Sequence, residues 1–164
     1  MKIAVLSDTH IPVTQKDLPK EVYDGLTGVD MILHAGDLVE FEVLEKLLKI
    51  APVRAVCGNM DDSKIAAKLP KKDVIKAEEV SIGLIHGWGP PSGLIELVGR
   101  EFKNVDAIVF GHSHNAISET RNGILFFNPG SPTDRIFAPY NSYGILDVQG
   151  KTISGRIIKI KNGY

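Results

Sequence analysis

The chain has 164 residues, of which 43% are hydrophobic and 24% charged, the balance of an ordinary folded domain. Its formal net charge of −1 excludes the global positive field of a nonspecific nucleic-acid or membrane binder, so any anion affinity has to arise locally. The single cysteine, Cys57, cannot form an internal disulfide, and it ends an apolar run in which a free thiol acts as a small hydrophobe. Without a signal-peptide core or a membrane-length apolar run, we expect one cytoplasmic domain over residues 1–164.

The first part of the chain alternates strand and helix patterns. Continuous apolar runs predict buried strands at 2–6, 31–34 and 53–57. Apolar periodicity with proline boundaries predicts helices at 18–26, 41–50 and 61–69. The alternation is typical of parallel strands joined by helices.

The second part consists mostly of strands. A hairpin is predicted for 74–77 and 81–85 around Glu78-Glu79, followed by a helix at 93–102. Further strands are expected at 107–110, 116–120, 124–127, 143–148 and 152–160, with a turn at Gln149-Gly150 between the last two. About ten strands fit two sheets packed face to face and flanked by helices.

Five short polar fragments each follow one of the apolar runs. They are Asp8-Thr9-His10, Gly36-Asp37, Gly58-Asn59, His86-Gly87 and Gly111-His112-Ser113-His114. Open α/β sheets place their ligands outside the carboxyl ends of the strands, so we expect the fragments to converge. Each alone is weak evidence, because an aspartate after a strand is commonly a turn residue or a helix cap. Together they contain four of the five histidines of the chain, and imidazole with carboxylate suits zinc, manganese and iron.

The fragments supply seven candidate metal ligands: Asp8, His10, Asp37, Asn59, His86, His112 and His114. One mononuclear site does not need seven, whereas two ions roughly 3.5–4 Å apart use them naturally and keep positions open for water or substrate. Asp37 is the candidate bridge, because a bidentate anion is needed where two cations repel each other. Two divalent ions, two carboxylates and one hydroxide leave a charge of about +1, which attracts an anion such as phosphate.

Glycines and histidine spacing fit such a site. A glycine adjoins a candidate ligand at four places, Gly36, Gly58, Gly87 and Gly111, and permits a sharp turn or a close backbone approach. His112 and His114 are two residues apart, so in extended backbone their side chains leave on the same face. We expect one of them to serve each ion.

The motifs D-x-H, G-D, G-N, H-G and G-H-x-H, in this order, resemble the calcineurin-like metallophosphoesterases. Asn128-Pro129-Gly130-Ser131 resembles a motif of the small single-domain phosphodiesterases of the YfcE type, and the motifs together span residues 8–131. The resemblance implies an α/β fold, a four-layer αββα sandwich of two mixed β-sheets flanked by helices (the metallo-dependent phosphatase fold). It also implies one ion held by Asp8, His10, Asp37 and His114, and another held by Asp37, Asn59, His86 and His112.

The same resemblance implies hydrolysis of phosphate esters by in-line attack of a hydroxide that bridges two divalent metal ions. Mn²⁺ is the expected metal, with iron, zinc, nickel or cobalt as alternatives. Asn59, His86 and Asp61 are then the candidate catalytic residues, and Asn59 and Arg135 are candidate substrate-binding residues.

One position departs from the pattern of the larger phosphatases. Their G-N motif is followed by a histidine that contacts phosphate or protonates the leaving alkoxide, whereas this chain has Met60. Asp61 resembles an aspartate of the small members, but a lone carboxylic acid is mostly ionised at neutral pH. We therefore expect activity on esters with good leaving groups, such as aryl phosphodiesters, and slow hydrolysis of alkyl phosphates.

Four further residues have competing interpretations. We expect His34 to support the ligands by hydrogen bonding rather than to bind metal, and Asn128 to fix its own loop. Trp88 either walls the cleft or only packs. For Arg135 a phosphate contact is favoured over a solvated loop position, because its forked donors suit an anion and its loop is rich in proline and glycine.

Three functions remain open. The leading one is a metal-dependent phosphodiesterase acting on a small-molecule or nucleotide-like diester, without specific nucleic-acid or membrane binding. The alternative is a phosphomonoesterase or nucleotide pyrophosphatase on the same metal pair. A minor alternative is a non-catalytic scaffold of the same fold, as in the retromer subunit that resembles this family, because fold alone does not fix function. Small relatives also suggest a homodimer or homotetramer.

Overall fold

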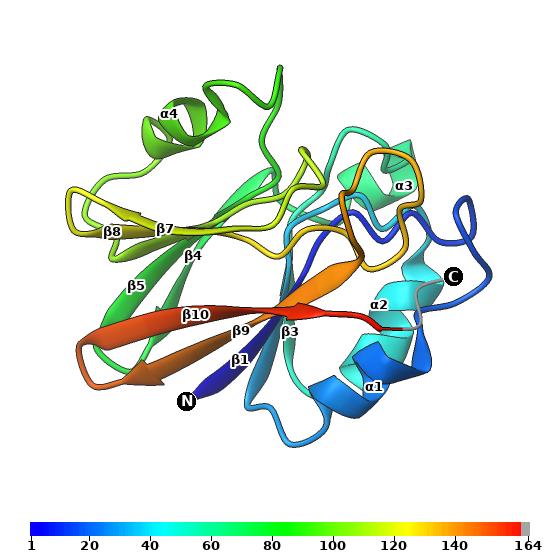
Figure 1. Cartoon of the computed structure of the whole chain (residues 1–164), viewed down its shortest axis with the longest axis horizontal. Coiled ribbons are helices and arrows are strands. Elements are labelled where there is room, and N and C mark those ends of the chain that lie inside the picture. The colour runs from blue at the N-terminus through cyan, green and yellow to red at the C-terminus, as the bar shows by residue number, and fades with distance from the viewer. Residues whose placement is uncertain (162–164) are drawn as a thin grey trace.

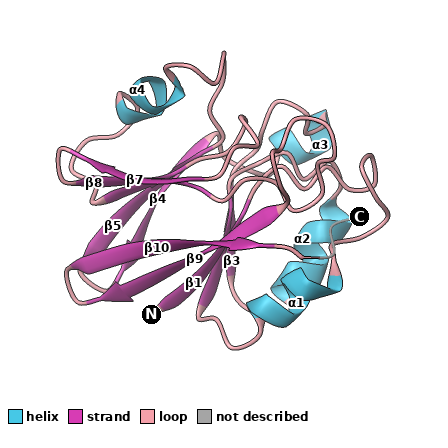
Figure 2. Cartoon of the chain, in the orientation of Figure 1, coloured by secondary structure: helices cyan, strands magenta, loops and turns pink. Residues whose placement is uncertain are grey.

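Two five-stranded β-sheets face each other at the centre of the molecule, and helices cover their outer faces (Figure 1). The computed structural model describes residues 1–161. Figure 2 shows the four layers, with the magenta sheets between the cyan helices and most of the long loops gathered at one end. The predicted αββα sandwich of two mixed sheets is confirmed.

The first sheet has the strand order β10-β9-β1-β2-β3. Its strands are β1 (Lys2–Leu6), β2 (Met31–His34), β3 (Val53–Ala55), β9 (Ser142–Gln149) and β10 (Thr152–Lys159). The three strands β1, β2 and β3 run parallel, and β9 lies antiparallel to β1. Helices α1 (Lys20–Leu26) and α2 (Phe41–Leu48) connect the parallel strands and cover the outer face of this sheet.

The second sheet has the strand order β4-β5-β6-β8-β7. Its strands are β4 (Lys72–Ala77), β5 (Val80–Ile85), β6 (Ala107–Val109), β7 (Ile117–Arg121) and β8 (Ile124–Asn128). β5, β6 and β8 are parallel, whereas β4 and β7 pair antiparallel at the two edges. Helix α4 (Leu94–Gly99) covers the outer face, and the short α3 (Ser63–Ala66) follows the N-cap Asp62.

The continuous apolar runs are explained by burial of both faces of the central strands. In β1, Ile3 and Val5 pack into the core between the sheets, while Ala4 and Leu6 pack against the helices. Successive side chains of a strand point to opposite faces, so a strand covered on both sides needs no polar alternation. Phe127 of the second sheet is fully buried in the same central core.

Most expected elements are present, with helices shorter than expected and two local differences. The strand expected over 53–57 ends at Ala55, since the Cys57 N–H donates to the carbonyl oxygen of Pro70, and Cys57 is half-buried. The expected turn at Gln149-Gly150 lies one residue later, because Gln149 still pairs with Thr152 in the ladder. Among residues 1–161, none of the helices has the length and apolar character needed to cross a membrane.

Candidate metal centre

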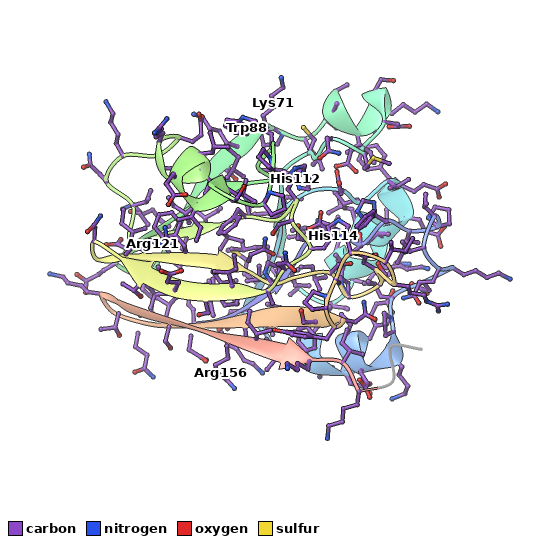
Figure 3. The ribbon with its side chains drawn as sticks, turned by 45° about the horizontal axis from the view of Figure 1, so that its top comes forward. Lys71, Trp88, His112, His114, Arg121 and Arg156 are labelled. Carbon is purple, nitrogen blue, oxygen red and sulfur yellow. The ribbon has the colours of Figure 1, made fainter. Side chains whose placement is uncertain are left out.

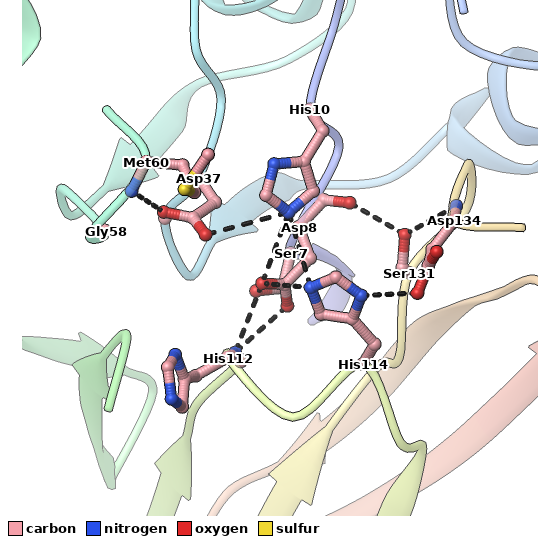
Figure 4. A network of polar contacts seen from close by, with 12 residues as sticks. Ser7, Asp8, His10, Asp37, Gly58, Met60, His112, His114, Ser131 and Asp134 are labelled. Atoms are coloured by element: carbon pink, nitrogen blue, oxygen red, sulfur yellow. Dashed lines mark hydrogen bonds and ion pairs between the residues drawn. The ribbon is translucent and has the colours of Figure 1, made fainter. Parts of the chain in front are cut away.

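The five polar fragments meet at the end of the sandwich where β1, β2, β3, β5 and β6 finish. Figure 4 shows Asp8, Asp37 and His114 close together at this end. Backbone bonds continue the strand pairing into the fragments: the Asp8 N–H donates to Gly36 O and the Gly111 N–H to His86 O, both at 3.0 Å. Asp8 also joins the two sheets, because its carboxylate accepts the backbone N–H of His112 at 3.0 Å. The predicted convergence is confirmed.

One group of candidate ligands lies around His10 and His114. Their Nε2 atoms are 3.3 Å apart, and His114 Nε2 lies 3.4 Å from Asp8 Oδ1. Asp8, His10 and His114 each offer an atom within 4.8 Å of the others, a spacing that could hold one metal ion.

A second group lies around His86. Its Nε2 is 3.3 Å from Asp37 Oδ2 and 3.0 Å from Asn59 Oδ1, and His112 Nδ1 is also 3.0 Å from Asn59 Oδ1. Asp8, Asp37 and His86 form the other set whose ligand atoms lie within 4.8 Å of one another. Asp8 is therefore within reach of both sets.

Asp37 lies between the two groups. Its Oδ2 is 3.6 Å from His10 Nε2 and 3.3 Å from His86 Nε2, while its Oδ1 accepts the backbone N–H of Met60 at 2.8 Å. One oxygen is thus fixed by the backbone and the other faces both sets of nitrogens. A carboxylate in this position could contact ions held by either set.

Three histidines have their outer ring nitrogen committed to an acceptor. His86 Nδ1 contacts Ala35 O at 2.7 Å, His112 Nε2 contacts Gly89 O at 2.9 Å, and His114 Nδ1 contacts the Asp134 carboxylate. Because carbonyl and carboxylate oxygens only accept, each of these nitrogens carries the proton in the neutral ring. The other nitrogen then presents a lone pair to the cluster, which is the tautomer that binds a metal ion. The donor set therefore fits divalent metal.

The ligand backbone is strained. Asp8, His10, Asp37, His112 and His114 all have φ between 44° and 69°, in the left-handed region. That conformation costs an ordinary residue roughly 1–2 kcal/mol, and such strain concentrates at functional sites. The expected extended backbone at His112 and His114 is therefore wrong. Their side chains still enter the cluster, His112 toward Asn59 and His114 toward Asp8.

At two of the adjoining glycines, the backbone lies so close to another side chain that a Cβ would clash with it. A Cβ on Gly58 would lie 2.1 Å from Asp37 Oδ1, and a Cβ on Gly111 would lie 1.8 Å from Ser7 Oγ. Real Cβ atoms do not come so close, and both neighbours are themselves buried. The predicted close approach of backbone to ligand is confirmed at these two positions.

Burial and charge oppose each other in the cluster. Asp8 and Asp37 are almost wholly buried. Burial raises the pKa of Asp37, but the bond and charge of His86, the Met60 N–H and the charge of His10 together outweigh burial and lower it. Burial would likewise lower the pKa of His114, yet Asp8 and Asp134 raise it to about 9. The buried carboxylates therefore stabilise positive charge within the cluster.

Asp134 is the supporting residue that the sequence interpretation missed. It contacts His114 Nδ1 and accepts backbone N–H groups from 136, 137 and 138, which shape its own loop. The Ser131 hydroxyl donates to Asp8 O at 2.7 Å and accepts the Asp134 N–H at 3.0 Å (Figure 4). The one indication of this role in the sequence is that Asp134 lies three residues after Ser131, the last residue of the Asn128 to Ser131 motif.

The structural roles expected of His34 and Asn128 are confirmed. His34 is fully buried, its Nδ1 accepts the Gly36 N–H and its Nε2 contacts the Thr9 hydroxyl. Burial lowers the pKa of His34 to about 4. Asn128 donates to Gly111 O and accepts the Gly130 N–H, so it fixes the loop after β8.

The remaining candidate residues lie around the cluster. Asp61 accepts backbone N–H groups from Asp37, Val39 and Gly58. Met60 is exposed beside the ligands, and Trp88 lines a cavity next to His86. Arg135 is exposed and is not part of the lining of that cavity or of the one beside His114.

The fold and this cluster together define an α/β sandwich with a buried histidine–carboxylate cluster at its strand ends that could hold metal. A family model described as the calcineurin-like phosphoesterase superfamily domain matches residues 1–151. The chain belongs to this superfamily.

Relatives and solved structures agree with that assignment. A probable metallophosphoesterase of Methanocaldococcus jannaschii is 40% identical over 81% of this chain and 69% of its own length. One from Methanothermobacter thermautotrophicus is 36% identical over 97% of this chain and 92% of its own. The structure of vacuolar protein sorting 29 from Cryptosporidium parvum is similar with a TM-score of 0.84 and 26% identity, covering 99% of this chain and 93% of that one.

Proposed function

We propose that this metallophosphoesterase is a phosphodiesterase that uses two divalent metal ions, Mn²⁺ first among them. One ion would be held by Asp8, His10, Asp37 and His114, and the other by Asp37, Asn59, His86 and His112. Such ions, when bound, polarise phosphoryl oxygens and activate water as a nucleophile. The observation that carries the proposal is the arrangement of inner histidine nitrogens on both sides of Asp37 Oδ2.

The residues of the chain position the ester. Asn59 stands between His86 and His112, so its amide group is available at the same place for a phosphoryl oxygen. The buried carboxylates and the fixed imidazole tautomers hold charges and dipoles in place before substrate arrives. Preorganised charge of this kind costs no rearrangement during reaction and accounts for much of enzymatic rate enhancement.

An apolar cavity supports an aryl or similarly apolar ester group. The cavity has a volume of 470 Å³ and includes His10, Asp37, His112 and His114 in its lining. Its outer wall is made of side chains that are otherwise exposed to solvent: Val13, Met60, Ile136 and Phe137. Ile136 is 81% and Phe137 74% exposed, which is unusual for large apolar side chains beside a buried charged cluster. An apolar leaving group would cover them.

Asp61 is better suited to positioning than to proton transfer. Its Oδ2 accepts the N–H groups of Asp37 and Gly58 at 3.0 and 2.7 Å, and its Oδ1 accepts that of Val39 at 2.7 Å. Both oxygens are therefore occupied as acceptors. We propose that Asp61 holds the loops that carry Asp37 and Asn59, in place of the acid role that its sequence position suggested. Arg135 remains a proposed contact to substrate phosphate.

A monoesterase or pyrophosphatase would use the same ions and differ in the residues that line the substrate cavity. The apolar cavity favours a diester with an apolar arm over a small monoester.

The non-catalytic alternative is raised by the likeness to vacuolar protein sorting 29. Against it stands the complete set of seven candidate ligands, in which three histidines have a fixed tautomer. A cytoplasmic location, a single domain over 1–164 and a homo-oligomeric state stay predictions.

Purified protein supplied with Mn²⁺ and matched p-nitrophenyl mono- and diesters tests the proposal. We expect the p-nitrophenyl diester to be hydrolysed faster than p-nitrophenyl phosphate. Ethyl esters without the aryl group should react slowly, because Met60 stands where the larger phosphatases have an acid that protonates the leaving group. Replacing Phe137 by Ala should raise KM for the aryl diester by about tenfold, since a buried aromatic contact contributes 1–3 kcal/mol. A faster monoester reaction would favour the alternative activity, and equal rates on aryl and alkyl diesters would contradict the leaving-group argument.

A further inference from the structure

A second cavity adjoins the metal centre on the other side of Asn59. It has a volume of 490 Å³ and is lined by the centre itself through Asn59 and His86, and further out by Lys71, Lys72, Trp88 and Glu101. The apolar cavity also includes Asn59 in its lining. In Figure 3, Lys71 and Trp88 lie together beyond His112, on the side away from His114. A phosphodiester centred on the metal site therefore has one cavity for each of its two ester arms.

The charge of this second cavity is positive. Lys72 is neutralised, because its Nζ lies 2.8 Å from a carboxylate oxygen of Glu101 and also bonds to the Glu101 carbonyl. Lys71 is exposed in the lining, and among the described residues no ion pair is formed with it. The cavity thus keeps one ammonium group that no carboxylate compensates, in a protein whose net charge is −1.

The cavity also offers an aromatic face. Trp88 is 46% exposed, although an indole in water gains by covering its ring. It lies two residues after the candidate ligand His86, and both line this cavity. Stacking of a base on an aromatic side chain strengthens binding by roughly 5- to 150-fold and does not depend on which base it is. A planar ring and a negative charge are together the features of a nucleotide.

We propose that this cavity binds the non-leaving arm of the diester and selects a nucleotide-type arm, with Trp88 against its base and Lys71 against a second anionic group. The apolar cavity then takes the leaving arm. This inference rests on the proposed phosphodiesterase function and narrows its substrate class to asymmetric diesters with one apolar and one anionic arm.

Three esters that release the same p-nitrophenolate test the charge selection. They are thymidine 5′-(p-nitrophenyl phosphate), the same compound with a 3′-phosphate, and p-nitrophenyl phosphorylcholine. Because the leaving group is constant, differences in kcat/KM report the other arm. We expect the 3′-phosphorylated ester to be preferred over the unphosphorylated one by about tenfold, as for one charge-assisted contact, and the choline ester to be poorest.

Variants of the cavity separate the charges. Lys71→Glu should lower the ratio of kcat/KM for the 3′-phosphorylated over the unphosphorylated thymidine ester to one or below. Lys71→Arg should retain the preference. Glu101→Gln should increase it, because Lys72 loses its compensating carboxylate. The matched control is Lys49→Ala, an exposed lysine just after α2 that lines neither cavity. The preference should also fall as salt is raised from 0.05 to about 0.5 M, since screening shortens to a few ångströms.

Trp88 has its own readout. Trp88→Ala should lower kcat/KM for both thymidine esters by the same factor, about tenfold, and leave their ratio unchanged. Hydrolysis of all three esters without any preference for the 3′-phosphate would overturn the cavity assignment and leave the phosphodiesterase proposal standing. A preference that persists in Lys71→Glu would also overturn it. Absence of hydrolysis of every ester by the Mn²⁺-loaded protein would overturn both.

Discussion

At the residue scale, Asp134 has the clearest supporting role, because it fixes the tautomer of a candidate ligand. Its carboxylate accepts from His114 Nδ1 and is held in turn by three backbone N–H groups. Asp134→Asn should weaken Mn²⁺ binding by about 10–100-fold, the usual effect of losing such a partner. Calorimetric titration with Mn²⁺ measures this, with Asp73→Asn as control, since Asp73 pairs with Arg54 and accepts the Val74 N–H and contacts no candidate metal ligand. Equal affinities of the Asp134 variant and the unchanged protein would contradict the role.

His34 makes a pH-dependent contribution to stability. Its pKa is lowered to about 4 in the folded protein, against 6.5 for an ordinary histidine, because it is fully buried. Below pH 6.5 the unfolded chain therefore binds more protons, and stability is lost as the pH falls from about 6.5 to about 4. The shift corresponds to about 3 kcal/mol. Above pH 7 the histidine is neutral in both states and contributes no slope.

Urea unfolding of the metal-free protein between pH 4 and 7 checks this. His34→Asn keeps an acceptor for the Gly36 N–H but cannot titrate. The free energy of unfolding of this variant should depend less steeply on pH than that of the unchanged protein. Parallel pH profiles of the two proteins would show that His34 has no such effect.

Gly111 and Gly99 form a matched pair for the packing of the centre. Gly111→Ala places a Cβ within 1.8 Å of Ser7 Oγ and 2.8 Å of Asp8 Oδ2, whereas a Cβ at Gly99 meets only Phe126 at 3.4 Å. We expect Gly111→Ala to lose metal binding together with about 2 kcal/mol or more of stability from overpacking. Gly99→Ala should be neutral or stabilising by up to about 1 kcal/mol, because it lies in α4. Denaturant curves with and without Mn²⁺ compare the two.

At the scale of elements, Asp61 joins the segments that follow β2 and β3. It receives N–H groups from Asp37 and Val39 after β2 and from Gly58 after β3. Asp61→Asn replaces one acceptor oxygen by a donor, which cannot satisfy all three. We expect lower Mn²⁺ affinity, and a loss of kcat at saturating metal that is equal for good and poor leaving groups. A loss that grows as the leaving group becomes poorer would instead identify Asp61 as the general acid.

The elements also show where sequence interpretation works and where it stops. The buried runs of β1 and β2 and the helix periodicity of α2 predicted their elements within two residues, because core burial dictates those patterns. The convergence of the candidate ligands could also be predicted, because each polar fragment follows an apolar run typical of a strand. The left-handed backbone of His112 and His114 and the role of Asp134 did not, because loop conformation and contacts distant in sequence leave no periodic pattern. The second cavity joins Lys71 to Trp88 across two separate loops, which spacing alone could not predict.

At the scale of the whole molecule, the centre connects the two sheets. Asp8 and Asp37 extend from the first sheet, and His86, His112 and His114 extend from the second. Metal bound by these residues would therefore link the two halves of the sandwich and favour the folded state by mass action. Mn²⁺ at 100 times its Kd should add about 2.7 kcal/mol and raise Tm by several degrees. Scanning calorimetry with Mn²⁺ or with a chelator measures this shift, and an unchanged Tm would mean that the two halves are not joined through metal.

The proposed function depends on Asp37 bridging two metal ions in a catalytic centre. Metal content and hydrolysis of bis(p-nitrophenyl) phosphate, measured on the same preparations of the unchanged protein and of Asp37→Asn, test this bridge. We predict two Mn²⁺ ions per chain and clear activity in the unchanged protein, and at most one ion with a rate reduced by about 100-fold or more in the variant. Two ions and an undiminished rate in Asp37→Asn, or a fully loaded but inactive unchanged protein, would contradict it.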